Sequence, residues 1–513
     1  MAKPLSSTPP LLSLRPIPAV RRRLLFYFPG YDPDAERRYR TLFVREFRRY
    51  ARLFKVGRPH VSTASSSIDK QVQTWTVRVG ESKQTETIYA VMLWDDIVRA
   101  DMDRSLFISA LFNAFALLRV VANGTFFRIF KASWKCGCLI LYPFVMTLLL
   151  AGVVLLLAAL SYRVLTTAFG WPSWISLALG AAAGFATLHR MMPWLERAFL
   201  WQLMNDWVFN WQHANGRRPD YTARLEAFTD HIQSQISGAE IDEILLVGHS
   251  TGALTAAEVA ARLLARDKQL GRDGPALSLL TLGSSLPIVA MQPGAHPIRA
   301  EIESLVASNS LVWADYQAPQ DWMNFPGFNP SRDLHLRVSQ AEAANPVIRS
   351  AEFRRIMSPQ VYRRVNTSPF KTHFQFLMAN HTPGIYDVFA LTLGPLCLRD
   401  RVLDENASTL GNSYSIQGYI DEVSHTSIRG WGYDSSAGSS GIEIGIFVND
   451  CPAQIAVADQ FRQDLMTARI GNSHHGFECK FDPPLSTAED QNILVRRLAD
   501  NFVIGAVVLR ATG

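Results

Sequence analysis

The sequence predicts an α/β protein in which a mostly parallel sheet is interrupted by two transmembrane helices and followed by an all-β domain. Three observations support this prediction. Apolar runs typical of buried strands alternate with amphipathic helical patterns over about the first 400 residues. An uncharged stretch long enough to cross a bilayer lies within that alternation. After about residue 410, the pattern changes to short apolar runs separated by Gly, Ser, Asn and Asp turns.

Length and composition limit the classes of protein to consider. The chain has 513 residues, of which 48% are hydrophobic, so two or three structural units are expected. The net charge is +6, but the basic residues are scattered or sit beside apolar runs, which favours a membrane surface over a nucleic-acid partner. The five scattered cysteines form neither a disulfide framework nor a paired zinc spacing, so we expect a reducing compartment, with no metal or cofactor.

The first regular element is a strand. Residues 1–21 contain prolines where a signal peptide needs a continuous apolar core, so this segment is expected to be a short disordered leader. The apolar run at 22–28 predicts a strand that ends in a Pro-Gly turn, and a charged amphipathic helix is expected at 35–54. A second buried strand is expected within 86–96.

A long uncharged region follows in the second quarter of the chain. No charged side chain occurs from Cys136 to Tyr162, and a bilayer core requires about 20 apolar residues. A second uncharged stretch follows Arg163 and carries small residues along its middle, which favours close packing against a neighbouring helix. We predict transmembrane helices at about 138–160 and 168–188. The alternative, two buried helices of a soluble core, fits poorly because such helices are seldom apolar on all sides over this length.

The charges around this hairpin predict its orientation. Basic residues lie outside the two helices, and only Arg163 lies between them, so both flanks and the domains attached to them are expected in the cytoplasm. The aromatic-rich segments at 105–130 and 193–211 are amphipathic, and each is expected either to lie flat on the bilayer or to pack on the sheet. The flanking basic residues are Arg119, Arg128, Lys131 and Lys135 before the hairpin, and Arg190 and Arg197 after it.

Strands and helices alternate again downstream of the hairpin. An amphipathic helix at 220–237 leads to an apolar strand at 243–247, and further short apolar runs occur at 277–285 and 310–317. This alternation is typical of a parallel sheet covered by helices. The hairpin therefore interrupts the sheet in sequence without ending it.

The last part of the chain has a different organisation. We predict that the α/β region spans residues 22–400, that 401–412 is a linker, and that 413–513 form a separate β-sandwich. Short runs such as GIEIGIFVND and FVIGAVVLR carry the alternation of half-buried strands, and turn residues separate them.

Residues Gly248 to Gly252, with the sequence GHSTG, match a pattern that exposes a nucleophilic serine on a sharp turn. The pattern Gly-x-Ser-x-Gly is common by chance, but here a buried strand precedes it and a helical pattern follows it. Both are required, because the strained turn lifts the serine hydroxyl above the sheet edge and larger side chains would collide there. We therefore predict that Ser250 is a nucleophile; a turn serine without chemistry is the alternative.

The stretch LLVGHSTGAL, in this context, resembles the nucleophile turn of the α/β-hydrolase superfamily. The resemblance covers residues 22–395, with the membrane hairpin as an insertion. It implies a bacterial, membrane-associated serine hydrolase of the esterase or lipase type, located in the inner membrane. It also implies that the catalytic acid and then the histidine follow Ser250 in the chain.

The segment SLVWADYQAPQDWMNF supplies two candidates for the acid. Asp315 lies inside or at the end of the apolar run, and Asp321 lies in the loop beyond it. The segment resembles one in lipase-like relatives whose loop aspartate orients the histidine, so Asp321 is favoured over Asp315. A turn or strand-end aspartate without a catalytic role remains the alternative for either.

Three histidines follow the acid within this region. His335 belongs to an expected strand and comes too early. His373 follows a Ser-Pro turn at the start of an apolar helical pattern, where the histidine of the resembled family often lies, so we predict that it is the base. His381 is the alternative base, and a surface histidine at a helix start is the alternative reading of His373.

This combination has a chemical reason. A serine hydroxyl is a weak nucleophile, so an imidazole must accept its proton and later protonate the leaving group, while a carboxylate fixes the tautomer. The resemblance implies that an oxyanion hole is formed by the backbone N–H groups of Thr251 and Tyr31, each contributing about 3 kcal/mol to the transition state. The chain departs from the family's usual His-Gly pair here, because Pro29 precedes Gly30.

The C-terminal segments GYIDEV, GWGYD and FRQDLMTARIGNSHHGFE resemble a β-sandwich module appended to bacterial glycosyltransferases. This resemblance leaves a glycan or a protein as a possible partner of the domain. His474 and His475 are adjacent but lack further ligands at suitable spacing, so no metal site is predicted there.

Together these observations predict a membrane-anchored serine hydrolase that cleaves esters or thioesters of lipid-like acyl chains through an acyl-enzyme. The bilayer and the acyl substrate are its expected partners, and no nucleic acid is expected. The alternative is a non-catalytic membrane scaffold that keeps the fold and binds through the β-sandwich. Catalysis is favoured because a serine, candidate acids and a histidine are all present.

Overall fold

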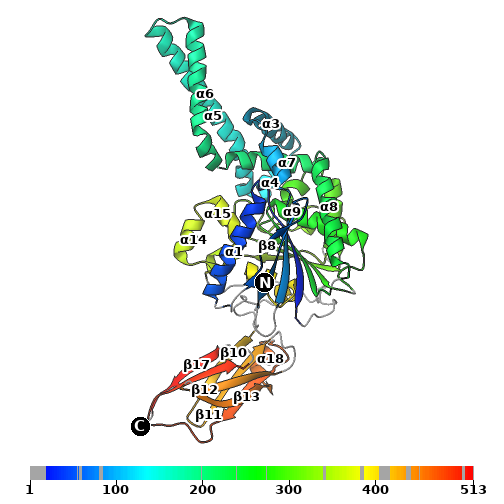
Figure 1. The fold of residues 1–513 in the computed structure, drawn as a ribbon, viewed down its shortest axis with the longest axis vertical. Helices are drawn as coiled ribbons and strands as arrows, with labels where there is room; N and C mark the ends of the chain where they lie inside the picture. The colour runs from blue at the N-terminus through cyan, green and yellow to red at the C-terminus, as the bar shows by residue number, and fades with distance from the viewer. Residues whose placement is uncertain are drawn as a thin grey trace.

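We describe a computed structural model of the 513-residue chain. It describes residues 19–511 except 55, 57–59, 80–84, 198, 239, 273, 339–342, 382–385, 404–415, 435–440, 450, 469 and 499–502. Most of the predicted leader at 1–21 and most of the predicted linker at 401–412 therefore lie outside the described residues. Figure 1 shows an α/β body with a helical hairpin projecting from one end and two antiparallel sheets at the other.

The body is built on a nine-stranded, mostly parallel sheet, as predicted. Strands β1 and β5 to β9 run parallel, whereas β4 pairs antiparallel with β5. In spatial order the strands are β2 (His60–Val61), β4 (Val72–Val79), β5 (Thr85–Met92), β1 (Arg22–Phe28), β6 (Glu243–His249), β7 (Ala276–Leu282), β8 (Leu311–Gln317) and β9 (Val347–Ser350), while β3 (Ser65–Ser66) pairs with β4.

Helices cover both faces of this sheet and form two hydrophobic cores. The central strands are apolar on both faces, as expected for buried parallel strands. One core includes side chains of α7 (Leu200–Ala214), α8 (Pro219–Ile236), α9 (Thr251–Arg266), α10 (Leu286–Ala290) and α11 (His296–Ala307). The other includes α1 (Ala35–Leu53), α13 (Phe353–Ile356), η2 (Gln375–Leu377), α16 (Val388–Leu393) and α17 (Leu398–Leu403), and the short helices α12 (Pro330–Asp333), α14 (Pro359–Val365) and α15 (Pro369–Phe374) connect these elements.

The predicted hairpin is formed by α5 (Trp134–Thr167) and α6 (Ser173–Arg197), which pack along one another. A Cβ atom on Gly180 would lie 2.6 Å from the carbonyl oxygen of Ala158, and one on Gly184 would lie 2.8 Å from Val154 Cγ1. These small residues therefore permit the close approach that was predicted. The second helix begins at Ser173 rather than at 168, because the turn includes Gly170 with a positive φ of 64°.

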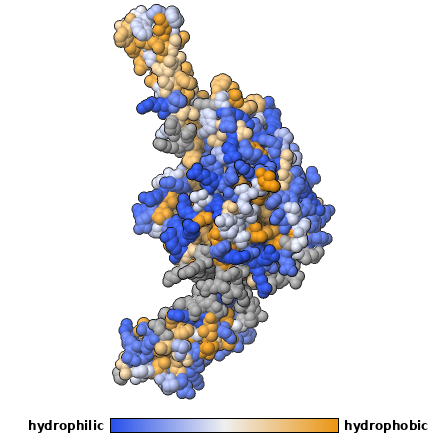
Figure 2. All heavy atoms as spheres, viewed as in Figure 1, coloured by the Kyte–Doolittle hydropathy of each residue, from blue (hydrophilic) through white to orange (hydrophobic). Residues whose placement is uncertain are grey.

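The length and composition of α5 suit a membrane span. At a rise of 1.5 Å per residue it is about 50 Å long, more than the about 30 Å of a hydrocarbon core. Among the described helices, α5 alone is by itself long and apolar enough to cross a membrane, and its most apolar stretch is not buried. Helix α6, the second predicted span, is not apolar enough, so the structure supports one of the two predicted spans. Helix α2 (Asp95–Met102) and the following α3 (Leu106–Ala122) reach this length and composition only when taken together, as one pair bent by 103°. Figure 2 shows apolar residues over much of the hairpin surface.

The two aromatic-rich segments beside the hairpin differ in structure. The segment at 193–211 includes most of α7, and the inner residues of this helix are buried in the body, so α7 is a packed helix. The segment at 105–130 forms α3 (Leu106–Ala122) and most of α4 (Thr125–Ala132). These helices expose the large apolar side chains of Phe107, Ile108, Leu111, Phe112, Phe115, Leu118, Val121, Phe127 and Phe130.

The described residues of the C-terminal part, from 416 onward, form strands and one short helix, α18 (Gln463–Thr467). Its two four-stranded antiparallel sheets share one hydrophobic core, to which Ile428 and Phe477 contribute from one sheet and Ile444 and Val495 from the other. One sheet contains β10 (Ile416–Val423), β11 (Ser427–Asp434), β15 (His474–Lys480) and β14 (Gln460–Phe461). The other contains β13 (Cys451–Ala458), β12 (Ile442–Val448), β16 (Gln491–Arg497) and β17 (Val503–Leu509).

Candidate active site

Ser250 occupies a strained turn between β6 and α9. Its backbone has φ 59° and ψ −126°, a conformation that costs a non-glycine residue about 1–3 kcal/mol. Two backbone hydrogen bonds hold the turn: the Ser250 amide donates to the Leu282 carbonyl at 3.1 Å, and the Ser285 amide donates to the Ser250 carbonyl at 3.3 Å. The neighbouring strand β7 and the loop after it therefore support the strained serine.

The two glycines of the motif are required by close backbone approaches. A Cβ atom on Gly248 would lie 2.3 Å from the carbonyl oxygen of Gly252. A Cβ atom on Gly252 would lie 2.1 Å from the carbonyl oxygen of Phe28, at the end of β1. Backbone atoms cannot move aside as a flexible side chain can, so β6 approaches the start of α9, and the turn packs against β1, only without these side chains.

The loop after β1 lies beside Ser250. A Cβ atom on Gly30 would be 3.1 Å from Ser250 Cβ and 3.6 Å from Ser250 Oγ. Tyr31, the first predicted oxyanion donor, directly follows this glycine. Thr251, the second, is the first residue of α9, where a backbone N–H has no acceptor within its own helix. Both predicted donors thus belong to segments that meet at Ser250.

Asp321 and His373 form a buried ion pair. His373 Nδ1 lies 2.7 Å from Asp321 Oδ2, and their side chains are 3% and 0% exposed. The other carboxylate oxygen, Oδ1, accepts a hydrogen bond from the Met323 amide at 2.9 Å. Because a carboxylate only accepts, Nδ1 carries the proton and Nε2 is the ring atom left to accept one. His373 Nε2 is buried and has no hydrogen-bond partner among the described residues.

These residues reach the same edge of the sheet from different elements. Ser250 directly follows β6, Asp321 lies in the loop after β8, and His373 belongs to α15. The carboxyl ends of parallel strands meet at one edge, which is where α/β proteins place their ligand sites. The chain thus brings a strained serine and an Asp-His pair to one edge through segments up to 123 residues apart.

The structure places the alternative acid elsewhere. Asp315 lies within β8, where Thr281 Oγ1 donates to its carboxylate at 2.6 Å and Gln317 Nε2 donates at 2.7 Å. Burial raises the pKa of Asp315 above its usual range. Its two carboxylate oxygens are therefore bonded within the sheet, whereas Asp321 bonds to the imidazole.

The alternative base also lies in different surroundings. His381 has its Nε2 in close contact with the guanidinium of Arg49 on α1, and its backbone amide donates to the Ile356 carbonyl at 2.8 Å. Burial and then the charge of Arg49 lower the pKa of His381. None of these contacts of His381 involves Ser250 or either candidate acid.

A second histidine, which the sequence did not single out, packs against His373. The ring of His249 lies 4.4 Å from that of His373, and its Nε2 donates to the His373 carbonyl at 3.1 Å. Burial, and then the charge of His373, lower the pKa of His249 well below its usual range, so this imidazole is neutral. His249 therefore holds the segment that carries His373. Its place beside Ser250 in the motif was the only available signal.

Helix α7 contacts both predicted oxyanion segments. Gln202 Nε2 donates to the Tyr31 carbonyl at 2.7 Å. Four residues later, Asp206 Oδ1 accepts a hydrogen bond from the Thr251 hydroxyl at 3.0 Å. Residues four apart share one face of a helix, so one face of α7 braces the loop after β1 and the turn after β6 together.

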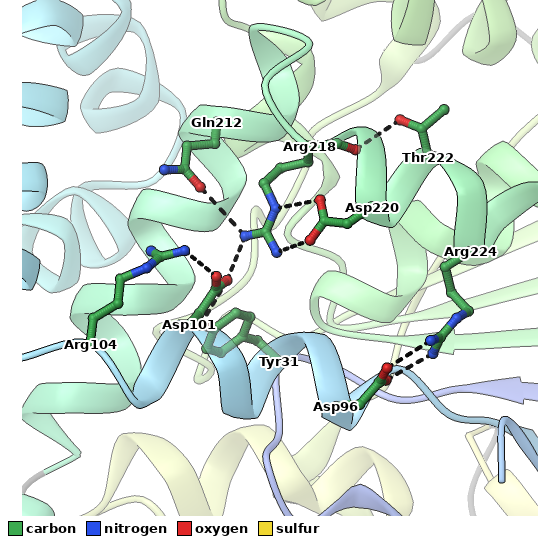
Figure 3. Close-up of polar contacts among 9 residues, drawn as sticks. All are labelled: Tyr31, Asp96, Asp101, Arg104, Gln212, Arg218, Asp220, Thr222 and Arg224. Atoms are coloured by element: carbon green, nitrogen blue, oxygen red, sulfur yellow. Dashed lines mark hydrogen bonds and ion pairs between the residues drawn. The ribbon is translucent and has the colours of Figure 1, made fainter. Parts of the chain in front are cut away.

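Figure 3 shows how the Tyr31 side chain is held. Its hydroxyl donates to Asp101 at 3.3 Å, and Asp101 also pairs with the guanidinium groups of Arg104 and, at 2.5 Å, of Arg218. Arg218 in turn bonds Asp220 at the start of α8. Burial and then the charge of Asp101 raise the pKa of Tyr31, so its hydroxyl stays protonated. The network connects the Tyr31 loop to α2 and α8.

The two ends of the hairpin contact the segments that carry Asp321 and His373. At the start of α5, Ser133 Oγ donates to the Asn324 carbonyl at 3.0 Å, and the rings of Trp134 and Trp322 lie 5.4 Å apart. After α6, the Phe199 ring stacks on Phe370, the second residue of α15, with centroids 3.6 Å apart. The hairpin is thus packed against both loops of the site.

The side chains of Ser250, His373 and Asp321 at this edge of the sheet suit acyl transfer. Among the residues that the structure describes, no group of three or more His, Cys, Asp or Glu side chains could hold a metal ion. A strained serine, a histidine with a free buried Nε2 and an aspartate on its Nδ1 are the groups that covalent serine catalysis uses. Comparison of the chain with protein-family models, curated proteins and solved structures gives no match.

Proposed function

We propose that this protein is a membrane-anchored serine hydrolase of the α/β-hydrolase superfamily that cleaves carboxylic esters or thioesters. The observation that carries the proposal is the buried 2.7 Å pair of Asp321 and His373 at the sheet edge where Ser250 sits on its strained turn. A structural ion pair does not require a strained serine beside it, and a turn serine does not require a buried acid and imidazole.

Each group has a role in this reaction. His373 Nε2 accepts the proton of the Ser250 hydroxyl as the oxygen attacks the acyl carbon, and the leaving alcohol or thiol then takes that proton. Asp321 stabilises the imidazolium that forms in between. The amides of Thr251 and Tyr31 bind the oxyanion. Water then attacks the acyl-enzyme by the reverse sequence of proton transfers, which releases the acid and restores Ser250.

A fluorophosphonate probe tests this assignment, because it reacts only with an activated serine. Protein kept in detergent or nanodiscs is expected to be labelled at one site, and Ser250→Ala is expected to abolish labelling. A matched control is Ser234→Ala, which removes an exposed hydroxyl that donates to the His231 carbonyl on α8 and should leave labelling in place. Labelling that survives Ser250→Ala, or the absence of labelling in the wild-type protein, would contradict the proposal.

The expected substrates are lipid-like acyl esters. The hairpin and the exposed apolar faces of α3 and α4 adjoin the body, so a long acyl chain could pass from the lipid phase to Ser250 without full exposure to water. This avoids a transfer cost of about 0.8 kcal/mol per methylene. In a chain-length series of esters assayed in nanodiscs, turnover is expected to rise with chain length. A flat profile, or best turnover on acetyl and butyryl esters, would reject this route and leave the hydrolase assignment standing.

We also propose the bacterial inner membrane as the location, with the α/β body and the C-terminal domain in the cytoplasm. Two features support this orientation. Both ends of the hairpin join the same body, and its basic residues lie toward those ends, as Lys135 and Arg190 do, whereas only Arg163 lies near the turn. The C-terminal sheets lie at the opposite end from the hairpin, which would leave them free for a glycan or protein partner (Figure 1).

A further inference from the structure

Asp206 is an acid at the candidate site with no role in the mechanism above. It lies on α7, and its Oδ1 accepts two hydrogen bonds, from Thr251 Oγ1 at 3.0 Å and from Asn210 Nδ2 at 2.9 Å. Two donors on one oxygen fix the orientation of the carboxyl group. The side chain is half-buried. Helix α7 thus holds a pre-oriented carboxyl group against the residue directly after Ser250.

The second oxygen of Asp206 is available. Oδ2 makes no hydrogen bond within the described part of the chain, and it is not among the fully buried polar atoms that lack a partner. Burial raises the pKa of Asp206, and the nearby charge of His373 lowers it. The carboxyl group that carries this unpaired oxygen is hydrogen-bonded to Thr251, the residue directly after Ser250, so it lies beside the proposed reaction site.

We propose that Asp206 determines substrate specificity: its Oδ2 accepts a hydrogen bond from a donor group on the alcohol part of the ester. This inference rests on the proposed hydrolase function and adds to it a substrate class, acyl esters whose alcohol carries a hydroxyl or an ammonium group near the scissile bond. A hydrogen bond to a charged group favours such substrates by roughly 10- to 100-fold. An alcohol without a donor would leave the carboxylate unpaired.

A purely structural role for Asp206 predicts different behaviour. If the residue only holds Thr251, then Asp206→Asn should be neutral, because the amide oxygen can still accept from Thr251 and Asn210. The same substitution places an NH₂ group where Oδ2 was, and an NH₂ group cannot accept from an ammonium donor. Asp206→Asn therefore removes the acceptor for the ester's donor group but keeps the hydrogen bond from Thr251, while Asp206→Leu removes both.

Three esters of one long-chain acid test the inference: the n-propyl ester without a donor, the 2-hydroxyethyl ester with a hydroxyl, and the 2-(dimethylamino)ethyl ester with an ammonium group. Burial raises the pKa of Asp206 to about 6, so assays at pH 7.5 keep it ionised. The wild-type protein is expected to prefer both donor esters over the propyl ester by roughly tenfold or more in kcat/KM. Asp206→Asn is expected to abolish the preference for the ammonium ester, reduce that for the hydroxyl ester, and leave propyl ester turnover within about twofold.

The control is Asp230→Asn, which removes an exposed carboxylate that pairs with Arg266 on α9 and should change none of the three values. The inference is wrong if the wild-type protein prefers neither donor ester, if Asp206→Asn keeps both preferences, or if all three esters lose turnover equally. Preference for one donor ester alone would identify a hydroxyl or an ammonium as the recognised group. Probe labelling of Ser250 separates these results from failure of the hydrolase assignment, because labelling without preference rejects only the role of Asp206.

Discussion

Replacing Ser250 or His373 with alanine is expected to lower ester turnover by about 10⁶-fold, the scale seen when a serine enzyme loses its nucleophile or base. Ser250 is the proposed bond-forming group, and His373 is the proposed acceptor of its proton. The two losses should not add, since each residue is ineffective without the other. Turnover of a long-chain ester in nanodiscs measures the effect, and circular dichroism checks that the variants fold.

His381→Ala is the matched control for the base. This histidine follows His373 by eight residues but contacts Arg49 and the segment after β9, away from the Asp-His pair. Its removal should change turnover by less than about tenfold, as expected for a residue outside the reacting groups. Full activity in His373→Ala together with a large loss in His381→Ala would reverse the assignment of the base.

Asp321→Asn is expected to lower turnover by about 10⁴-fold while the protein stays folded. The carboxylate accepts from His373 Nδ1 at 2.7 Å, so Nδ1 is protonated and Nε2 can accept the serine proton. An amide whose NH₂ group faces the ring would instead donate to Nδ1, which puts the ring proton on Nε2. The pH dependence of the residual turnover is a second measurement, because Asp321→Asn removes the negative charge that stabilises the imidazolium of His373.

Asp315→Asn is the comparison for the acid. Asp315 accepts from Thr281 and Gln317 within the sheet rather than from His373. Burial raises its pKa, which lowers the cost of a neutral group at this position. We expect normal folding and turnover within about tenfold of wild type. A severe loss at Asp315 with normal activity at Asp321 would contradict the proposed acid.

Local pattern predicted most of the fold. Alternating apolar and polar periods located the parallel strands, the helices between them and the two antiparallel sheets at the C-terminus, because those periods record which faces are buried. The pairing of β4 was not predicted: this strand precedes β5 in the chain and lies antiparallel outside it. Such pairing depends on contacts between strands rather than on the pattern within one strand.

Whether each aromatic-rich segment is buried or exposed also depended on tertiary packing. Both have amphipathic sequences, so both interpretations stayed open. In the structure α7 packs among α2, α3, α5 and α10 and is largely buried, whereas α3 and α4 keep large apolar side chains on the surface. An amphipathic pattern specifies that one face is apolar, but it does not specify what covers that face.

For the candidate site, the sequence by itself identified the turn that carries Ser250, the proposed nucleophile. The pattern that identifies this serine, two glycines between a buried strand and a helix, is local, so it could be recognised in the sequence, although β7 and the loop after it also hold the turn. Asp321 could only be favoured over Asp315, because six residues separate two aspartates whose directions depend on how the loop after β8 folds. Tertiary structure alone placed Asp321 on His373, His249 behind it, and Asp206 beside Thr251. These contacts join segments 45 to 124 residues apart, and the free energy that fixes them comes from the packing of whole elements rather than from any local sequence preference.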